Sequence, residues 1–313
     1  MKQKLTIVTR PQGNNGALVR GDVTLPDYDL DFIDEPVLVK GFRKMVRGLE
    51  YDICEMALTT YICARAHGVR FTALPIFLVR DFHHGNMAWN TSLGMTRPKD
   101  LEGRRVGVNR GYTVTTGVWA RAILQDEHGV DLSAVNWAPS GDEHVESFVN
   151  PPNVQNLPSG NDMEAELQSG ALAGVVGTRF EGVHVAPIVP DAFGAGVAAL
   201  GNRGFYPINH LVVVRDDVLA ANPGLAAQLF EAFATSKLRY VDDLSNGRIE
   251  KLAAADRVHQ AAMSQMSDPL PYGIAPNHKT LTDLMAHAVR QQIIPAPVPL
   301  EDLFAQECHD LVG

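Results

Sequence analysis

The sequence predicts an α/β fold of two lobes with a ligand cleft between them. Its 313 residues are about twice the usual length of one domain. Strand-like runs alternate with helix-like runs, a pattern typical of βαβ units and a parallel sheet. A strand, a loop rich in hydroxyl groups and a helix follow one another twice, after Cys54 and after Asn109. Because ligands of open parallel sheets bind beyond the carboxyl ends of the strands, we expect both loops to face the cleft.

The first strand–helix set precedes residue 93. Its expected strands are 5–9, 28–33, 51–54 and 71–79, and an expected helix over 60–66 ends near Gly68. Between the second and third strands, apolar residues recur at the i, i+3, i+4 and i+7 spacing of one helix face. These residues are Phe42, Met45, Val46 and Leu49.

A second set begins after Pro98. It contains expected strands at 105–108, 135–138 and 173–176, with helices over 115–128 and 162–168. Glycines 194, 196, 201 and 204 indicate a flexible stretch. A strand over 211–214 then precedes a long helix with Leu225, Leu229 and Phe233 on one face. We therefore expect one discontinuous lobe of residues 1–92 and 208–313, with a helical C-terminal part, and an α/β lobe of residues 93–207.

The composition of the chain disfavours two classes of partner, nucleic acids and membranes. Lys and Arg total 27 against 36 Asp and Glu, which gives a formal net charge of -9. The chain has no concentrated basic patch, so we expect no nucleic-acid partner. No apolar run approaches the ~20 residues that span a bilayer, and we expect no membrane association. The three cysteines form no Cys-x-x-Cys pair, so the sequence favours a soluble cytoplasmic protein with reduced thiols.

The loop after the strand at 105–108 has the composition of an anion site. Backbone N–H groups and hydroxyls at a helix start attract an anion, and the helix dipole adds to this attraction. Arg110 supplies a planar fork suited to a carboxylate. The alternative is that Thr113 or Thr115 is only an N-cap residue. The candidate binding residues are Arg110, Tyr112, Thr113, Thr115 and Thr116.

Glu55 directly follows a predicted buried strand, and Thr59 and Thr60 follow it. Desolvation at the mouth of a strand can raise the pKa of a carboxyl group, which suits an acid catalyst. The alternative is a glutamate that acts only through the dipole of the following helix.

Imidazole groups occur at two further strand ends. Arg80, His83 and His84 follow the strand at 71–79, and His144 follows the strand at 135–138. Such groups titrate near neutral pH, although a surface loop is the alternative for each of them. Arg179 and His210 are further candidates, for substrate binding, as are Arg80, Thr59 and Thr60. A mononuclear metal site built from His83 or His84 with His144 and a carboxylate is a further alternative.

Common catalytic motifs are absent. The sequence contains no His-Glu-x-x-His, no phosphate-binding loop, no strand-linked Gly-x-Gly-x-x-Gly and no Gly-x-Ser-x-Gly. Nucleotide cofactors and serine hydrolysis therefore have no support from motifs.

Five segments together resemble the 4,5-dihydroxyphthalate decarboxylases. They are FRKMVR (42–47), CEMALTTY (54–61), VRDFHHG (79–85), GVNRGYTVTTG (107–117) and SGDEH (140–144). That family is similar in fold to type II periplasmic solute-binding proteins. The resemblance therefore implies two lobes and the non-oxidative loss of carbon dioxide from an aromatic dicarboxylic acid.

The resemblance also implies roles for the candidate residues. The residues of the anion site, with Arg80, would bind carboxylates, and one of Glu55, His83, His84 and His144 would protonate the ring. This route needs no organic cofactor, because a ring hydroxyl supplies the electrons. A homo-oligomer is the general expectation for a cytoplasmic enzyme. The competing function is a non-catalytic solute-binding protein, which would need the carboxylate-binding residues but no acid over the ring.

Overall fold

The structure, a computed structural model, describes residues 2–313. The chain forms two compact units. Unit 1 holds the chain up to Asp81 together with Ile208–Asp283 and Pro297–Gly313, and unit 2 holds Phe82–Pro207 and Leu284–Ala296. These units differ from the expected lobes in two places. The first segment ends at Asp81 rather than at residue 92, and residues 284–296 pack within unit 2.

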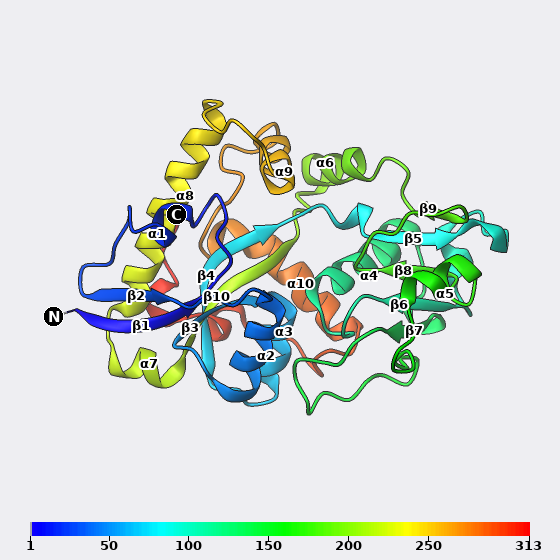
Figure 1. Cartoon of the computed structure of the whole chain (residues 1–313), viewed down its shortest axis with the longest axis horizontal. Coiled ribbons are helices and arrows are strands. Elements are labelled where there is room, and N and C mark those ends of the chain that lie inside the picture. The colour runs from blue at the N-terminus through cyan, green and yellow to red at the C-terminus, as the bar shows by residue number, and fades with distance from the viewer. Residues whose placement is uncertain (1) are drawn as a thin grey trace. The chain divides into compact units, whose positions relative to one another are not determined.

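Unit 1 is built on a five-stranded sheet of order β2-β1-β3-β10-β4. β1 (Gln3–Val8) pairs in parallel with β2 (Tyr28–Phe32) and with β3 (Ile53–Ala57). β10 (Ile208–Arg215) lies between β3 and β4 (Phe71–Arg80) and is antiparallel to both. β4 and β10 run side by side through the middle of unit 1 (Figure 1).

The expectation of a parallel sheet is therefore wrong for β10. This strand enters unit 1 after the chain has completed most of unit 2, so no βαβ crossover leads into it. Only a crossover connection ties a strand to the direction of its predecessor, and β10 is free to pair antiparallel.

Two helices of unit 1 bury the apolar face that the sequence predicted for each. In α2 (Leu38–Gly48) the predicted face is buried at Phe42, Met45 and Val46, while Leu49 ends the helix with φ 50°. The remaining helices are α1 (Gly16–Val19), α3 (Leu58–Ala66), α7 (Asp216–Ala221), α8 (Leu225–Ser245) and α9 (Ala254–Met263). In α8 the predicted face of Leu225, Leu229 and Phe233 is buried, which confirms that helix. α10 (His278–Arg290) begins in unit 1 and continues into unit 2.

Unit 2 is built on a second mixed sheet, of order β7-β6-β8-β5-β9. β6 (Arg105–Val108) is parallel to β7 (Asn136–Pro139) and β8 (Gly174–Val176). β5 (Met87–Asn90) is antiparallel to β8 and to β9 (Val185–Pro187). Within this unit, α4 (Thr115–His128) matches the predicted helix residue for residue, and α5 (Met163–Ser169) lies within one residue of its prediction.

The glycine-rich segment near residue 200 is a helix rather than a flexible stretch. α6 (Ala192–Arg203) starts at Asp191, whose side chain accepts a hydrogen bond from Gly194 N. Gly196 lies so close to Phe82 that an added Cβ would approach the Phe82 Cβ to 2.4 Å. Gly196 therefore serves close packing, and Gly204 ends the helix at φ 63°. The sequence pattern does not distinguish these uses of glycine from flexibility.

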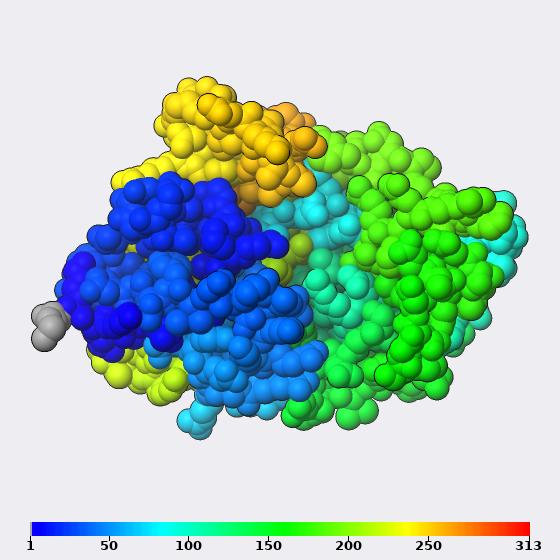
Figure 2. All heavy atoms as spheres, viewed as in Figure 1, coloured from blue at the N-terminus to red at the C-terminus, as the bar shows by residue number. Residues whose placement is uncertain are grey.

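In the space-filling view, the blue N-terminal segment of unit 1 adjoins the yellow α8 (Figure 2). A hydrogen bond of 3.3 Å from Leu18 N to Ser236 Oγ joins α1 to α8. Among the helices of residues 2–313, none has both the length and the apolar character that a membrane crossing requires.

Candidate active site

Glu55 is the central charged residue of the unit 1 sheet. It is the middle residue of β3, opposite Val212 of β10, and not the residue after the strand as predicted. The strand is longer than expected because all five of its residues are buried, Glu55 at 1% exposure included. A buried carboxylate needs several hydrogen bonds to remain charged.

Three groups supply those bonds. Thr9 Oγ1 donates to Glu55 Oε2 at 2.7 Å, and Arg10 N donates to the same oxygen at 3.1 Å. His210 Nδ1 lies 2.6 Å from Glu55 Oε1. Burial acts to raise the pKa of Glu55, but the hydrogen bond and charge of His210, with the bonds from Thr9 and Arg10, outweigh it and lower the pKa. Glu55 is therefore an ionised carboxylate, and not the high-pKa acid that strand-mouth desolvation suggested.

The other predicted residues of unit 1 lie near strand or helix ends. Thr59 and Thr60 are fully buried in the first turn of α3, and Thr60 Oγ1 has no hydrogen-bond partner among residues 2–313. Arg80 ends β4, is 3% exposed, and donates a hydrogen bond from Nη2 to Asn277 Oδ1. Asn277 in turn donates to the Pro271 and Gly273 carbonyls, each at 2.8 Å. Asn277 therefore holds the Arg80 side chain in position.

In unit 2, Arg110 stands in a strained and exposed conformation. Its φ is 67°, in the left-handed region that residues with a Cβ rarely adopt. Two bonds hold this backbone: Arg110 N donates to Ser140 Oγ at 2.9 Å, and Gly141 N donates to Arg110 O at 3.2 Å. The guanidinium is exposed and makes no hydrogen bond or ion pair with any residue from 2 to 313. It is therefore available for an external anion, and its role in carboxylate binding stays a prediction.

The backbone next to Arg110 already holds a carboxylate, that of Glu143. Tyr112 N and Thr113 N donate to Glu143, the latter at 3.3 Å, and Thr113 Oγ1 donates to Glu143 Oε2 at 2.5 Å. An added Cβ at Gly111 would lie 2.6 Å from Glu143 Oε2, so only glycine permits this approach. Burial raises the pKa of Glu143, although the hydrogen bonds from Thr113 and Tyr112 oppose the shift. The anion that the sequence assigned to these N–H groups is thus a side chain of the protein itself.

A buried arginine, Arg121, contacts the same turn through Tyr112. Arg121 of α4 is 0% exposed and stacks 3.9 Å from the centre of the Tyr112 ring. Its Nη2 donates to Tyr112 O at 2.6 Å and its Nε donates to Gln291 Oε1 at 2.8 Å. The residue preceding α4 is Val114, and no side chain caps the helix. Neither Thr113 nor Thr115 is therefore the N-cap residue that the alternative interpretation required.

The histidines of unit 2 lie in separate surroundings. His83 and His84 form a short 3₁₀ turn (His83–Gly85), and both are fully buried. His83 Nδ1 lies 2.9 Å from Asn86 Nδ2, whereas His84 Nε2 lies 2.9 Å from Glu127 Oε1. Glu127 also accepts a hydrogen bond from Arg203. His144 is 3% exposed, and Thr115 and Thr116 occupy the first turn of α4. Arg179 is exposed and donates from Nε to Gly85 O at 3.2 Å.

The described residues contain no cluster of potential metal ligands. Among residues 2–313, no group of three or more His, Cys, Asp and Glu side chains is placed to hold a metal ion. The site built from His83 or His84 with His144 and a carboxylate is therefore not formed.

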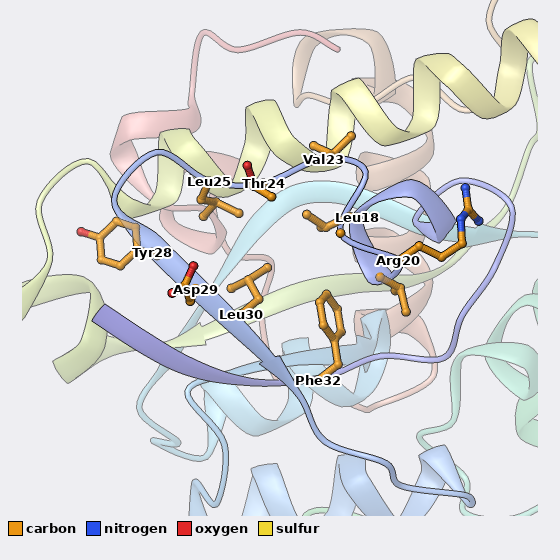
Figure 3. Close-up of a pocket in the computed structure, with 11 residues that line it drawn as sticks. Leu18, Arg20, Val23, Thr24, Leu25, Tyr28, Asp29, Leu30 and Phe32 are labelled. Carbon is orange, nitrogen blue, oxygen red and sulfur yellow. The ribbon is translucent and has the colours of Figure 1, made fainter. Parts of the chain in front are cut away.

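A pocket of about 350 Å³ in unit 1 lies apart from these residues. Leu18, Leu25 and Leu30 border it, with Arg20 at one end (Figure 3). It lies between the segment of α1 and the strand β2, and no predicted site residue lines it.

Comparison with known proteins relates most of the chain to a decarboxylase. A 4,5-dihydroxyphthalate decarboxylase of Comamonas testosteroni is 30% identical over 305 residues, which cover 91% of this chain and 91% of that protein. The chain belongs to the 4,5-dihydroxyphthalate decarboxylase family. The enzyme of the same name from Pseudomonas putida is 33% identical over 173 residues, which cover 52% of this chain and 65% of that protein. No protein-family model matches this family member.

Solved structures show the fold of this family member. The periplasmic aliphatic sulphonate binding protein SsuA of Escherichia coli superposes with a TM-score of 0.52 at 12% identity, covering 98% of this chain and 99% of that one. A DszB mutant in complex with biphenyl-2-sulfinic acid gives 0.54 at 17% identity, covering 97% of each chain. These similarities confirm the predicted periplasmic-binding-protein-like α/β fold.

The sequence patterns did not select several residues that form hydrogen bonds with the candidate side chains and fix their positions. Thr9 and Arg10 follow β1, so the rule that selected residues after other strands would also have selected them. Asn15 donates to Thr9 Oγ1 and to Arg10 O, each at 3.0 Å, and keeps that loop in place. Asn277, Glu127 and Gln291 contact residues far away in the sequence, and no local pattern marks them.

Proposed function

We propose that the protein decarboxylates 4,5-dihydroxyphthalate to protocatechuate and carbon dioxide. The observation that carries this proposal is the 30% identity to a 4,5-dihydroxyphthalate decarboxylase along nine-tenths of both chains. The available Arg110 guanidinium in unit 2 and the Glu55 carboxylate with its partner His210 in unit 1 agree with it. A dianionic substrate needs cationic partners, and the reaction needs a proton source.

The chemistry proceeds through protonation of the ring. Direct loss of carbon dioxide from an arene would leave a carbanion with no electron sink. The ring carbon that bears the departing carboxylate is para to a hydroxyl, which can supply electrons when that carbon is protonated. The resulting dienone loses carbon dioxide and becomes aromatic again. The net reaction consumes one proton and requires no redox partner and no organic cofactor.

The residues take the following roles in this proposal. The Arg110 guanidinium binds one substrate carboxylate. Because Glu143 occupies the N–H groups of Tyr112 and Thr113, Thr115 and Thr116 contribute through their hydroxyls. Arg80 assists in carboxylate binding, as do Thr59 and Thr60. The sequence placed the proton donor among Glu55, His83, His84 and His144, and the others would orient the ring hydroxyls.

The decisive experiment incubates the protein with 4,5-dihydroxyphthalate and measures carbon dioxide and protocatechuate. Release of both supports the proposal. Binding of the diacid without release would instead identify a solute-binding protein, the alternative function. Phthalate without hydroxyls is the matched control, because it carries both carboxylates but cannot supply electrons from the para position. Comparable turnover of phthalate would overturn the dienone route.

We also propose that the protein acts as a homo-oligomer in the cytoplasm on this small molecule alone. The net charge of -9 disfavours nucleic acid as a second partner, since like charges repel. Light scattering after size-exclusion chromatography measures the oligomeric state, and a monomer at physiological concentration would contradict the first part.

A further inference from the structure

The Glu55–His210 pair joins the neighbouring strands β3 and β10 of the unit 1 sheet. Both oxygens of Glu55 are engaged: Oε1 with His210 Nδ1 at 2.6 Å, and Oε2 with Thr9 Oγ1 at 2.7 Å and Arg10 N at 3.1 Å. The Glu55 side chain is 0% exposed, whereas that of His210 is 19% exposed. The pair therefore has a buried anionic end and an accessible imidazole end.

The orientation of the His210 ring is held from two sides. Nδ1 faces the Glu55 carboxylate, and the Phe42 ring meets the imidazole edge-on, with centroids 5.1 Å apart at 88°. In this arrangement Nδ1 carries the hydrogen that the carboxylate accepts. The other nitrogen, Nε2, makes no hydrogen bond with any residue from 2 to 313. A proton on Nε2 can therefore be transferred to a bound molecule.

The neighbouring titratable groups do not neutralise the negative charge of Glu55. Cys54 and Tyr272 are the other titratable side chains that interact with Glu55, and burial raises the pKa of both. Both are neutral near pH 7. The negative charge of Glu55 thus faces the His210 ring, whose Nδ1 lies 2.6 Å from Glu55 Oε1.

From this geometry we infer that His210 donates the proton to the substrate ring and that Glu55 is its positioning residue. The inference rests on the proposed function. It assigns the donor role to none of the four sequence candidates, Glu55 among them, but to the residue that Glu55 holds, which the sequence had offered only as a binding residue. A carboxylate whose pKa is lowered carries no proton at neutral pH to give, and both of its oxygens already accept hydrogen bonds.

The step balances without another reactant. The Nε2–H bond of the imidazolium breaks, and a C–H bond forms at the ring carbon that bears the carboxylate. The para hydroxyl supplies an electron pair and loses its proton to solvent. When the carbon–carbon bond breaks, its electron pair returns through the ring to that oxygen, which regains a proton from solvent. Neutral His210 then recovers its own proton from solvent.

The test compares the turnover and the substrate affinity of His210→Asn with those of wild type. General acid catalysis contributes about 10²–10⁴-fold, so we expect kcat to fall by that factor while Kd for the diacid stays close to the wild-type value. The matched control is His278→Asn, at an exposed histidine that starts α10. Added imidazole should restore part of the turnover of His210→Ala, because it can occupy the vacated space and donate a proton.

Glu55→Gln tests the positioning role. The amide keeps the shape of the side chain but removes the negative charge that faces His210 Nδ1. We expect a lower kcat and a change in the limb of the pH–rate profile that reports the donor. A purely structural role would change protein stability and leave this limb in place.

The outcomes separate the inference from the proposed function. If wild type releases no carbon dioxide from the diacid, the proposed function fails. If wild type is active and His210→Asn retains wild-type kcat, the donor assignment alone fails. Loss of substrate binding in His210→Asn would also overturn it, since His210 would then be a binding residue. If His210→Asn does not fold, His210→Gln is judged by the same two criteria.

Discussion

The Glu143 carboxylate accepts hydrogen bonds from Thr113 through both the backbone N–H, at 3.3 Å, and the side-chain Oγ1, at 2.5 Å. An acidic side chain of the protein thus satisfies the N–H groups that precede α4. It also ties the loop at 140–144 to the turn that carries Arg110. The Tyr112 and Thr113 N–H groups are consequently occupied, whereas the Arg110 guanidinium makes no hydrogen bond or ion pair within residues 2–313.

Replacing Glu143 should separate its charge from its hydrogen bonds. Glu143→Ala leaves the Tyr112 and Thr113 N–H groups buried without an acceptor, which costs about 1–3 kcal/mol for an unsatisfied group. Glu143→Gln keeps an acceptor oxygen, so we expect a smaller loss. Urea unfolding near neutral pH measures both, with the exposed neighbour Asp142→Asn as the control. Equal destabilisation of the Ala and Gln variants would contradict this role.

The same residue should make stability depend on pH. Because the pKa of Glu143 is raised above its ordinary value of 4.5, the folded state holds this proton more tightly than the unfolded state. Its contribution is present below about pH 4.5 and is lost as the pH rises through the folded pKa. The free energy of unfolding of wild type, relative to Glu143→Gln, should therefore fall over that window. A constant difference across the titration would show that Glu143 has no such linkage.

The left-handed conformation of Arg110 should lower the stability of unit 2, while its guanidinium should bind a substrate carboxylate. A left-handed conformation costs a residue with a Cβ about 1–2 kcal/mol, so Arg110→Gly should stabilise unit 2 and abolish carboxylate binding by the guanidinium. Arg110→Lys keeps the charge but loses the planar fork, and we expect substrate binding to weaken by about 1.5–3 kcal/mol. Calorimetric titration with the diacid measures this loss. Unchanged affinity in Arg110→Lys would rule out the assigned role.

Gln292 provides the control for the backbone effect. It is exposed, also has a positive φ, of 57°, and belongs to unit 2. Gln292→Gly should raise the thermal unfolding temperature as Arg110→Gly does, while substrate affinity stays at the wild-type value. Parallel loss of affinity in both variants would show that the effect on binding comes from backbone flexibility.

Arg121 should be essential for the stability of unit 2. Arg121→Met leaves the Tyr112 carbonyl and Gln291 Oε1 without their donor, at about 1–3 kcal/mol for each acceptor that stays buried and unpaired. Chemical denaturation should show a loss of that size. Arg97→Met is the control, because the Arg97 side chain is 71% exposed and exposed ion pairs contribute about 1 kcal/mol or less. Similar midpoints for both variants would contradict the supporting role of Arg121.

Protonation of His259 should lower the stability of unit 1 at acidic pH. Burial lowers its pKa from 6.5 to about 4, so between these values the unfolded state binds a proton that the folded state does not. Stability should fall as the pH falls from about 6.5 to about 4, by on the order of 3 kcal/mol in total at 1.36 kcal/mol per pKa unit. His259→Gln should lack this dependence, and the exposed His278→Gln should retain it. Identical acid profiles for wild type and His259→Gln would refute the prediction.

Local patterns in the sequence were sufficient for most elements. α4 was predicted over 115–128 and forms Thr115–His128, because its periodicity and the glycine that ends it, Gly129 at φ 65°, are properties of adjacent residues. The buried face of α8 follows from the same spacing. Family membership also came from the sequence, since several short segments that are weak singly are specific in combination.

The contacts that organise the candidate site came only from the tertiary structure. Glu55 meets His210 and Thr9 across two strand pairings, and Glu143 meets Thr113 from a loop thirty residues away. The antiparallel position of β10 places His210 opposite Ala57, two residues beyond Glu55. Propensity and periodicity describe neighbours along the chain, and they carry no information on which distant side chain fills a hydrogen-bonding position. The sequence by itself determined which residues could carry charge and protons, whereas packing between distant segments decided that Glu55 is ionised, that Glu143 occupies the anion-binding turn, and that Arg110 is left available.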